Sequence, residues 1–456
     1  MVHAFSVNGD YLALDTETGS LHLLDELSFL VLKAYIEAGG QRPEASALCS
    51  FSEYPHDDIY DVCSEIETLI SEGSLFAAEE NIEIGDFYPD KPRIKAMCLH
   101  LCHDCNLRCG YCFANTGDYN TGHRNFLSYE TGKNAVDFIV KSSGPRRNID
   151  IDFFGGEPLM NWDIVVKLTG YCEEQSKLKG KNIRLTITTN AVLLDDEKSE
   201  FINDHMENCV LSMDGRKFVQ DQMRPAPNGK GSYEIVKNNI LNFINKREDG
   251  TYYVRGTYTR KNLDFSEDVR HIVSLGAKHV SVEPVVGPED SDYSIRDEDL
   301  PRIFQEYEIL AKDMSERCED DRFEFFHFSI DLDGGPCAYK RLKGCGVGTE
   351  YVAVTPDGDI YPCHQLTGET EFLMGNVNDK PVVLNDLVSM RFSKLLVPQK
   401  TECNICWAKY YCSGGCPANA YHDTGDINGV YEKGCLIQKK RLECALWLKA
   451  MRVAVQ

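Results

Sequence analysis

The sequence predicts an α/β fold: a partial (β/α)6 barrel, with a small winged-helix-like domain before it and a cysteine-rich domain after it. Three observations support this prediction. The chain has 456 residues, too many for one ordinary domain. Short apolar runs alternate with amphipathic segments through its middle. Ten of its 19 cysteines follow residue 306, in Gly-rich sequence of weak periodicity that metal holds better than an apolar core does.

The first domain is predicted over residues 1–80. Its second half carries two helices, and Asp25 is suited to cap the first of them. A returning strand is predicted at Leu75–Phe76, so that the order of elements resembles a winged helix. The acidic stretch from 77 to 92 ends in prolines and is typical of a linker. The strands that open the domain alternate apolar and polar residues, at Ala4–Val7, Tyr11–Asp15 and Leu21–Leu24.

The second domain, predicted over residues 93–305, contains the strand-then-helix repeats of a parallel sheet with right-handed crossovers. In such sheets the chemistry gathers at the carboxyl ends of the strands. Six apolar runs are expected to form the strands: Ile94–Leu101, Ile149–Phe154, Leu185–Thr189, Val210–Met213, Tyr252–Tyr258 and His279–Pro284.

Three closely spaced cysteines, Cys105, Cys109 and Cys112, follow the first of these strands. Three thiolates this close can hold three irons of a [4Fe–4S] cluster and leave the fourth iron open to a ligand. The spacing CxxxCxxC resembles the signature of the radical S-adenosylmethionine (SAM) superfamily. The resemblance implies that the open iron binds SAM, whose reductive cleavage gives a radical that abstracts a hydrogen atom.

An alternative frame with the same spacing runs through Cys98, Cys102 and Cys105. The later frame is preferred because Cys98 and Cys102 lie inside an apolar strand, where cysteine is a common core residue. The family also favours an aromatic residue just before the third cysteine, and Tyr111 fits that preference.

Polar motifs end the next strands and support this assignment. The resemblance implies that Gly155, Gly156 and Glu157, which match the family's GGEP motif, hold the amino group of SAM. It likewise implies that Asn190 and Ser212, together with Tyr111, contact SAM. Arg224 lies in a familial segment, but the sequence gives it no role. No catalytic residue beyond these cofactor contacts is identified.

The third domain, predicted over residues 306–456, contains the pattern C-x12-G-x4-C, then C-x2-C-x5-C-x3-C, then one more cysteine, formed by Cys345, Gly358, Cys363, Cys403, Cys406, Cys412, Cys416 and Cys435. This spacing resembles the seven-cysteine SPASM domain that extends some radical SAM enzymes. The resemblance implies two auxiliary [4Fe–4S] clusters, and thus three clusters in the chain. The first would be held by Cys345, Cys363 and Cys416, with a fourth position that is either Cys337 or an open iron for a substrate thiolate. The second would be held by Cys403, Cys406, Cys412 and Cys435. The six isolated cysteines are expected to be buried or inert: Cys49, Cys63, Cys172, Cys209, Cys318 and Cys444.

Charge and hydropathy limit the partners. The net charge of −24 disfavours nucleic acid, because phosphates require a positive surface. No run of 18 apolar residues and no signal peptide are seen, so we expect a cytoplasmic protein without membrane contact. The cysteines are then expected to be reduced and to bind metal, not to form disulfides.

The domain order most closely resembles the thioether-forming maturases of six-cysteine (SCIFF-type) ribosomal peptides. The resemblance implies that residues 1–80 bind the leader of a Cys-rich precursor, that a peptide cysteine is linked to a carbon of another residue, and that a low-potential donor supplies electrons. The alternatives are an anaerobic sulfatase-maturing enzyme that makes formylglycine, a carbon–carbon cross-linking enzyme, a non-enzymatic iron–sulfur carrier and a DNA-binding regulator. The carrier has no use for SAM-binding motifs, and the acidic first domain argues against the regulator.

Overall fold

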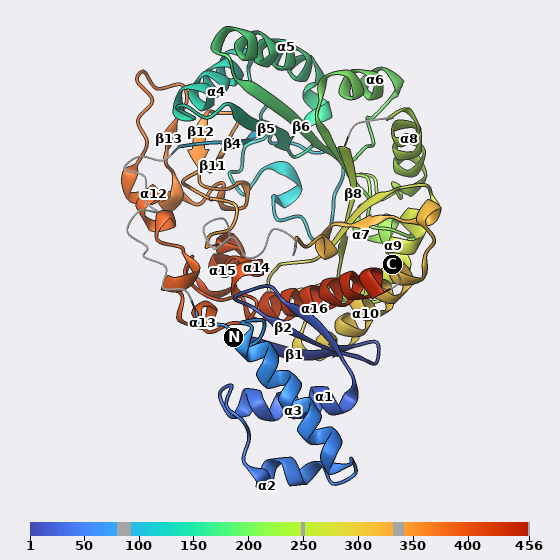
Figure 1. Ribbon diagram of the computed structural model, residues 1–456. Helices are drawn as coiled ribbons and strands as arrows, with labels where there is room; N and C mark the ends of the chain where they lie inside the picture. Colours follow the sequence, from blue (N-terminus) through green and yellow to red (C-terminus); the bar gives the residue numbers. More distant parts are fainter. Residues whose placement is uncertain (80–92, 248–250, 332–341, 455–456) are drawn as a thin grey trace.

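The computed structural model describes residues 1–79, 93–247, 251–331 and 342–454. Its main body is a ten-stranded sheet that curves into a partial barrel with helices around its outside (Figure 1). A small domain with its own three-stranded sheet lies below the barrel. The predicted α/β fold class is therefore confirmed.

The barrel strands follow one another in chain order and are parallel, as the strand-then-helix pattern predicts. They are β4 (Ala96–Cys102), β5 (Asn148–Gly155), β6 (Asn182–Thr189), β7 (Asn208–Ser212), β8 (Thr251–Tyr258) and β9 (His279–Pro284). The helices between and after them are α4 (Tyr129–Ser142), α5 (Trp162–Lys179), α6 (Asp196–His205), α7 (Lys217–Met223), α8 (Tyr233–Lys246), α9 (Phe265–Ser274) and α10 (Leu300–Glu316). All six carboxyl ends therefore point to the same edge of the sheet.

The C-terminal part of the chain extends the barrel sheet on both edges. The short β10 (Glu324–Phe325) pairs with β9, and β11 (Tyr351–Val354) pairs parallel with β4. An antiparallel pair, β12 (Asp359–Tyr361) and β13 (Gly375–Asn376), completes the second edge. Residue 306, where the third domain was predicted to begin, lies inside α10. The remaining helices are α12 (Asp386–Ser393), α13 (Thr401–Asn404), α14 (Lys409–Cys412), α15 (Pro417–Thr424) and α16 (Glu432–Ala454).

The N-terminal domain is an antiparallel sheet covered by helices. Its strands β1 (Val2–Val7), β2 (Asp10–Asp15) and β3 (Leu21–Leu24) lie in chain order. Asp25 caps the first helix by accepting a hydrogen bond from the Ser28 amide, as expected. The strand predicted at Leu75–Phe76 is absent from the described residues, because Phe76 has a φ of 51° that ends any extended conformation. The helices are α1 (Glu26–Glu37), α2 (Ala45–Leu48) and α3 (His56–Ser71).

The N-terminal sheet buries both of its faces. Ala13 packs with α1 and α3 in a small separate core. Phe5 and Leu12 on the other face join the main core, which also contains Trp447 of α16. The Trp447 indole N–H donates to Asp10 at 2.8 Å. The long helix α16 thus lies between the N-terminal domain and the barrel (Figure 1). Among the described residues, the helices are all too short or too polar to cross a membrane.

Candidate functional site

A cavity of about 250 Å³ lies at the carboxyl ends of the barrel strands. It is lined by the loop that follows β4 and by the ends of β5, β6 and β7. The structure brings together in its lining all nine residues predicted for the first cluster and for SAM: Cys105, Cys109, Tyr111, Cys112, Gly155, Gly156, Glu157, Asn190 and Ser212.

The three loop cysteines are partly exposed and line the same cavity. Burial, with the neighbouring Glu157 and thiols adding to it, raises the pKa of Cys105, and burial raises that of Cys109 to about 12. Such buried thiols need a bound cation to become thiolates. No three His, Cys, Asp or Glu side chains of the described chain converge on a point that would suit a single ion. Thiols spread around a common cavity fit a multi-iron cluster, in which each binds a different iron.

The backbone of the cluster loop is fixed on two sides. The Arg108 amide donates to the Pro225 carbonyl, just after α7, at 2.8 Å, and the Gly110 amide donates to the carbonyl of Met223, the last residue of α7, at 2.9 Å. The Glu157 amide donates to the Asp104 carbonyl at 2.9 Å. A Cβ at Gly156 would lie 2.0 Å from that carbonyl oxygen, so only glycine permits this approach. The local glycine pair therefore positions the cysteine loop against β5.

The Glu157 carboxylate, which is 1% exposed, is held by three hydrogen bonds. The Thr189 hydroxyl donates at 2.7 Å, and the amides of Asn190 and Leu159 donate at 2.8 and 3.0 Å. Burial raises the pKa of Glu157 to about 7, and these donors act in the opposite direction. An ammonium group in the cavity would favour its charged form, so this carboxylate suits the amino group of SAM.

Arg224, which had no role from sequence alone, faces the same cavity. Its Nε lies 3.0 Å from Asp214, whose carboxylate also accepts a 2.5 Å hydrogen bond from the Tyr111 hydroxyl. Its guanidinium lies over the Tyr111 ring, 5.5 Å from the centroid. Burial raises the pKa of Cys109, and the positive charge of Arg224 acts in the opposite direction. Arg224 therefore places a positive charge beside the loop cysteines. Only the fold reveals this, since Arg224 is far from Cys109 in the sequence.

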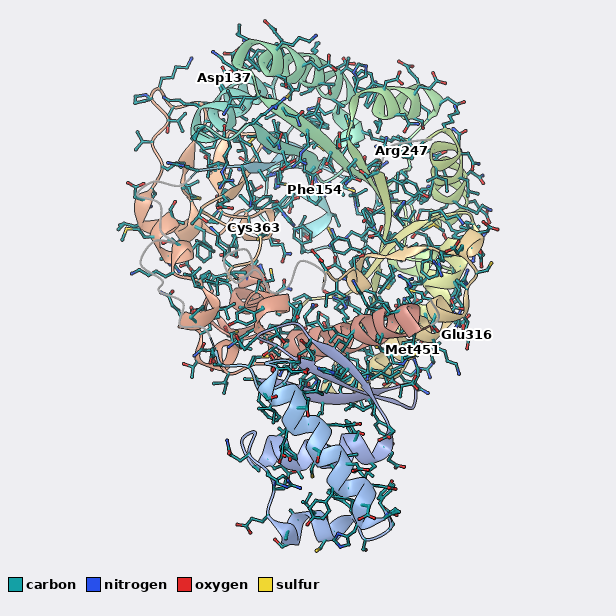
Figure 2. All side chains as sticks on the ribbon, in the orientation of Figure 1. Asp137, Phe154, Arg247, Glu316, Cys363 and Met451 are labelled. Atoms are coloured by element: carbon teal, nitrogen blue, oxygen red, sulfur yellow. The ribbon has the colours of Figure 1, made fainter. Side chains whose placement is uncertain are left out.

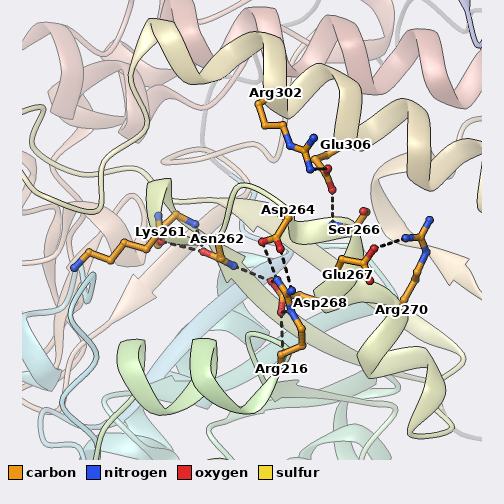
Figure 3. A network of polar contacts seen from close by, with 11 residues as sticks. Arg216, Lys261, Asn262, Asp264, Ser266, Glu267, Asp268, Arg270, Arg302 and Glu306 are labelled. Carbon is orange, nitrogen blue, oxygen red and sulfur yellow. Dashed lines mark hydrogen bonds and ion pairs between the residues drawn. The ribbon is translucent and has the colours of Figure 1, made fainter.

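An ion-pair network fixes the turn that follows Ser212 on β7 (Figure 3). The side chain of Arg216 donates to Asp264 and to the buried Asp268, with its Nε 2.8 Å from Asp268. A Cβ at Gly215 would lie 2.3 Å from the Asp268 side chain. These contacts join the loop after β7 to α9. The same loop contains Asp214, which accepts the hydrogen bond from the Tyr111 hydroxyl.

The three cysteines predicted for the first auxiliary cluster also come together. Burial and then the thiols of Cys416 and Cys345 raise the pKa of Cys363. These thiols come from the loop before β11, the end of β12 and the start of α15. Cys337, the alternative fourth ligand, lies outside the described residues. Cys363 lies near Phe154 (Figure 2), and the next two residues, His364 and Gln365, line the cavity that holds the loop cysteines.

The second predicted auxiliary set gathers around α13, α14 and the first turn of α16. Burial raises the pKa of Cys435 to about 11, with Cys412, Cys403 and Cys406 contributing in the same direction. A cavity of about 310 Å³ is lined by Cys403, Cys412 and Cys435, and also by Cys416. The donor set of four thiols fits one [4Fe–4S] cluster.

Residues between the cavities were not found from sequence. Glu283 and Asn419 line both of them. The ring of His364, next to Cys363, lies 5.2 Å from that of Phe154. His364 also lines the cavity at the carboxyl ends of the barrel strands, where SAM is predicted to bind. The only feature of the sequence that points to His364 as a site residue is its position directly after Cys363. No sequence motif identifies Glu283 or Asn419 as site residues.

The cysteines outside the three sets divide into two groups. Cys98 and Cys102 are buried in β4, and the Cys102 thiol donates to the Glu157 carbonyl at 3.0 Å, as suits a core residue. Cys63, Cys172, Cys209 and Cys444 are buried, as expected. Cys49 and Cys318 are exposed, so they are not core residues.

Comparison with known proteins agrees with this geometry. Residues 99–258 match the model of the radical SAM superfamily, and residues 345–408 match SPASM, an iron–sulfur cluster-binding domain. A cysteine-type anaerobic sulfatase-maturating enzyme of Clostridium novyi is 25% identical over 338 residues, covering 69% of this chain and 86% of its own.

Two solved structures share the fold. Native anSMEcpe with bound AdoMet and Kp18Cys peptide is 19% identical with a TM-score of 0.63, covering 79% of this chain and 99% of that chain. Streptococcus suis SuiB bound to S-adenosylmethionine is 16% identical with a TM-score of 0.50, covering 92% and 95%. Residues 99–258 are therefore a radical SAM domain and residues 345–408 a SPASM iron–sulfur cluster-binding domain, which supports the binding of SAM and of iron–sulfur clusters.

Proposed function

We propose that this enzyme matures a ribosomally made, Cys-rich precursor peptide by forming an intramolecular thioether between a cysteine sulfur and a carbon of another residue. The observation that carries the proposal is the adjacency of two thiol-lined cavities, which share Glu283, Pro284, Val286 and Asn419. A peptide segment at this junction would have SAM on one side and auxiliary-cluster cysteines on the other.

Three clusters are part of the proposal. Cys105, Cys109 and Cys112 would hold the one that binds SAM, and the two auxiliary sets would hold the others. When bound, these groups supply hydrogen-atom abstraction and one-electron transfer; the protein positions the reacting atoms and excludes water. The overall change removes two hydrogens from the peptide. The hydrogen atom from carbon would go to the radical derived from SAM, the thiol hydrogen would leave as a proton, and the remaining electron would pass to the iron–sulfur clusters.

Leader binding is assigned to the N-terminal domain. Strand β3 is the edge of its sheet, and Leu23 there is 51% exposed. An edge strand offers unpaired amides and carbonyls to which an extended leader can add as a further strand. The SuiB structure covers 92% of this chain, whereas the anSMEcpe structure covers 79%. The match to SuiB therefore includes segments of this chain that the match to anSMEcpe does not.

Formylglycine formation is the alternative, and the likeness to the Clostridium novyi enzyme supports it. The anSMEcpe structure was solved with the Kp18Cys peptide bound, which supports a peptide substrate in either case.

Mass spectrometry separates the two. The anaerobically reconstituted enzyme is incubated with SAM, a low-potential reductant and synthetic Cys-rich peptides, chosen from any short reading frames found beside its gene. A loss of about 2 Da per event with one thiol no longer alkylatable supports the thioether, and a loss of about 18 Da at cysteine supports formylglycine. SAM cleavage with every peptide unchanged would refute the peptide substrate.

A further inference from the structure

The loop that follows the cysteines of the SAM site has a strained backbone. Four of the eight non-glycine residues with positive φ in the described chain lie within residues 115–120: Asn115, Thr116, Tyr119 and Asn120. Thr116 is β-branched, and its φ of 59° and ψ of 25° lie in the left-handed region that such side chains rarely adopt. A strained conformation costs free energy and persists only where its surroundings hold it, so it points to a function for this loop.

Side-chain contacts hold the loop in this conformation. The Arg124 guanidinium donates to the Thr116 hydroxyl at 3.0 Å. Tyr119 is 2% exposed, and its ring centroid lies 4.5 Å from that of His100 and 4.6 Å from that of His103. The left-handed turn at Thr116 is therefore fixed by side chains on both sides of it.

This conformation directs the Thr116 amide at a cysteine of the SAM site. The amide donates to the sulfur of Cys112, four residues earlier in the chain, at 3.3 Å. Amides of a chain that turns into the left-handed region form concavities that bind anions, and iron–sulfur sites are among the known examples. The amide is thus in place for the negative charge that the sulfur carries as an iron ligand.

The other two loop cysteines have different neighbours. The Leu107 amide donates to the Cys105 sulfur at 3.4 Å, within a turn in which no residue has a positive φ. Cys109 has the positive charge of Arg224 beside it. Of the three cysteines, Cys112 is therefore the one whose hydrogen-bond donor depends on a strained loop.

We propose that Thr116 is a positioning residue for the cluster at Cys105, Cys109 and Cys112, the SAM cluster: its amide donates to the Cys112 thiolate and makes the bound cluster easier to reduce. Hydrogen bonds to the sulfurs help to set the reduction potential of an iron–sulfur cluster. Reduction adds negative charge, which a donor on a sulfur stabilises. The strained loop then serves to hold this donor in place. The inference does not depend on which peptide the enzyme modifies.

The test removes the amide donor and keeps the side chain. In the holoenzyme with reconstituted clusters, Thr116 is replaced by its α-hydroxy acid, so that an ester oxygen stands in place of the amide N–H. The matched control is the same replacement at Thr121 of the same loop, whose amide donates to the Asp118 carbonyl at 3.0 Å. A second control, T116G, keeps the amide and removes the side chain. Redox titration followed by electron paramagnetic resonance gives the potential of the SAM cluster, which is recognised by the change in its signal when SAM binds.

We expect the ester at Thr116 to lower the ratio of reduced to oxidised SAM cluster about tenfold at a fixed potential, a shift of about 59 mV for one electron. The T116G variant should keep the wild-type potential, because glycine adopts the left-handed conformation without strain, Tyr119 still anchors the loop and the amide remains. The ester at Thr121 should also keep the wild-type potential.

A wild-type potential in the Thr116 ester would overturn the proposal. An equal shift in T116G or in the Thr121 ester would also overturn it, because the potential would then follow the loop as a whole and not this amide.

A second measurement decides the question if the ester-containing chain does not fold. Wild-type enzyme made with threonine enriched in heavy nitrogen should show a nitrogen coupling to the reduced SAM cluster in pulsed electron paramagnetic resonance. T116G, which has no threonine at this position, should lack the coupling. A wild-type spectrum without the coupling, or a T116G spectrum that retains it, would overturn the proposal.

Discussion

The SAM-cluster loop and the auxiliary-cluster region both gather cysteines, but they are built differently. The first follows β4, which is paired along both edges within the parallel sheet, and its amides bond to neighbouring loops. The second set of auxiliary thiols comes from α13 and α14, of four residues each, and from the start of α16. The barrel core can form the first site without metal, whereas the second has little core of its own and needs its cluster to hold it.

The auxiliary region also supports the N-terminal domain. Lys409 in α14 is 3% exposed on its side chain and pairs with Glu17 and Glu79. Trp407, beside Cys406, stacks on His3 of β1 with ring centroids 3.9 Å apart. The auxiliary-cluster region and the predicted leader-binding sheet therefore share contacts.

The largest expected effect is that of removing iron. Anaerobic chelation should leave β4 to β9 protected from hydrogen exchange and expose residues 401–435, because only the latter depend on metal for their fold. Mass spectrometry of exchanged peptides measures this. Equal loss of protection in both regions would show that the fold of the barrel depends on metal as much as that of residues 401–435 does.

Single cysteine variants sharpen the contrast. C412S should speed exchange across residues 401–435 by about a thousandfold or more, as expected when a metal ligand set is broken at a cost above about 4 kcal/mol. C109S should abolish SAM cleavage and leave exchange in the barrel strands unchanged. The comparison fails if C109S also unfolds the barrel.

Breaking the contact between the auxiliary region and the N-terminal domain should have a smaller effect. K409M leaves the nearly buried Glu17 without its cation and should weaken docking by about 3 kcal/mol. Hydrogen exchange in β1 and β2 should rise, while SAM cleavage in the absence of peptide stays at the wild-type rate. K217M, which breaks an exposed pair with Glu234, is the control and should change little.

The smallest effect in free energy is expected in the SAM cavity itself. E157Q should weaken SAM binding by about 2 kcal/mol, roughly thirtyfold, because a neutral amide replaces the charged acceptor of an ammonium. Equilibrium dialysis against labelled SAM measures it, with D163N on the exposed start of α5 as the control. Unchanged affinity would remove Glu157 from the SAM site.

Much of the barrel follows from local pattern. The run His279–Pro284 is β9 residue for residue, and Leu21–Leu24 is β3. The nine predicted cavity residues meet because each follows a parallel strand, so that topology alone brings them to one edge. The predicted strand at Leu75–Phe76 failed because a single backbone angle at Phe76, set by packing, overrode an apolar pattern.

The sequence by itself predicted the six barrel strands from their period, and its cysteine and Gly-rich motifs predicted the cluster and SAM residues through their resemblance to a known family. Only the tertiary structure decided that β11 joins β4, that Arg224 lies beside Cys109, and that Glu283 and Asn419 line both cavities. These contacts join segments far apart in the chain. Their geometry is set by how whole elements pack to bury apolar surface, which no short motif encodes.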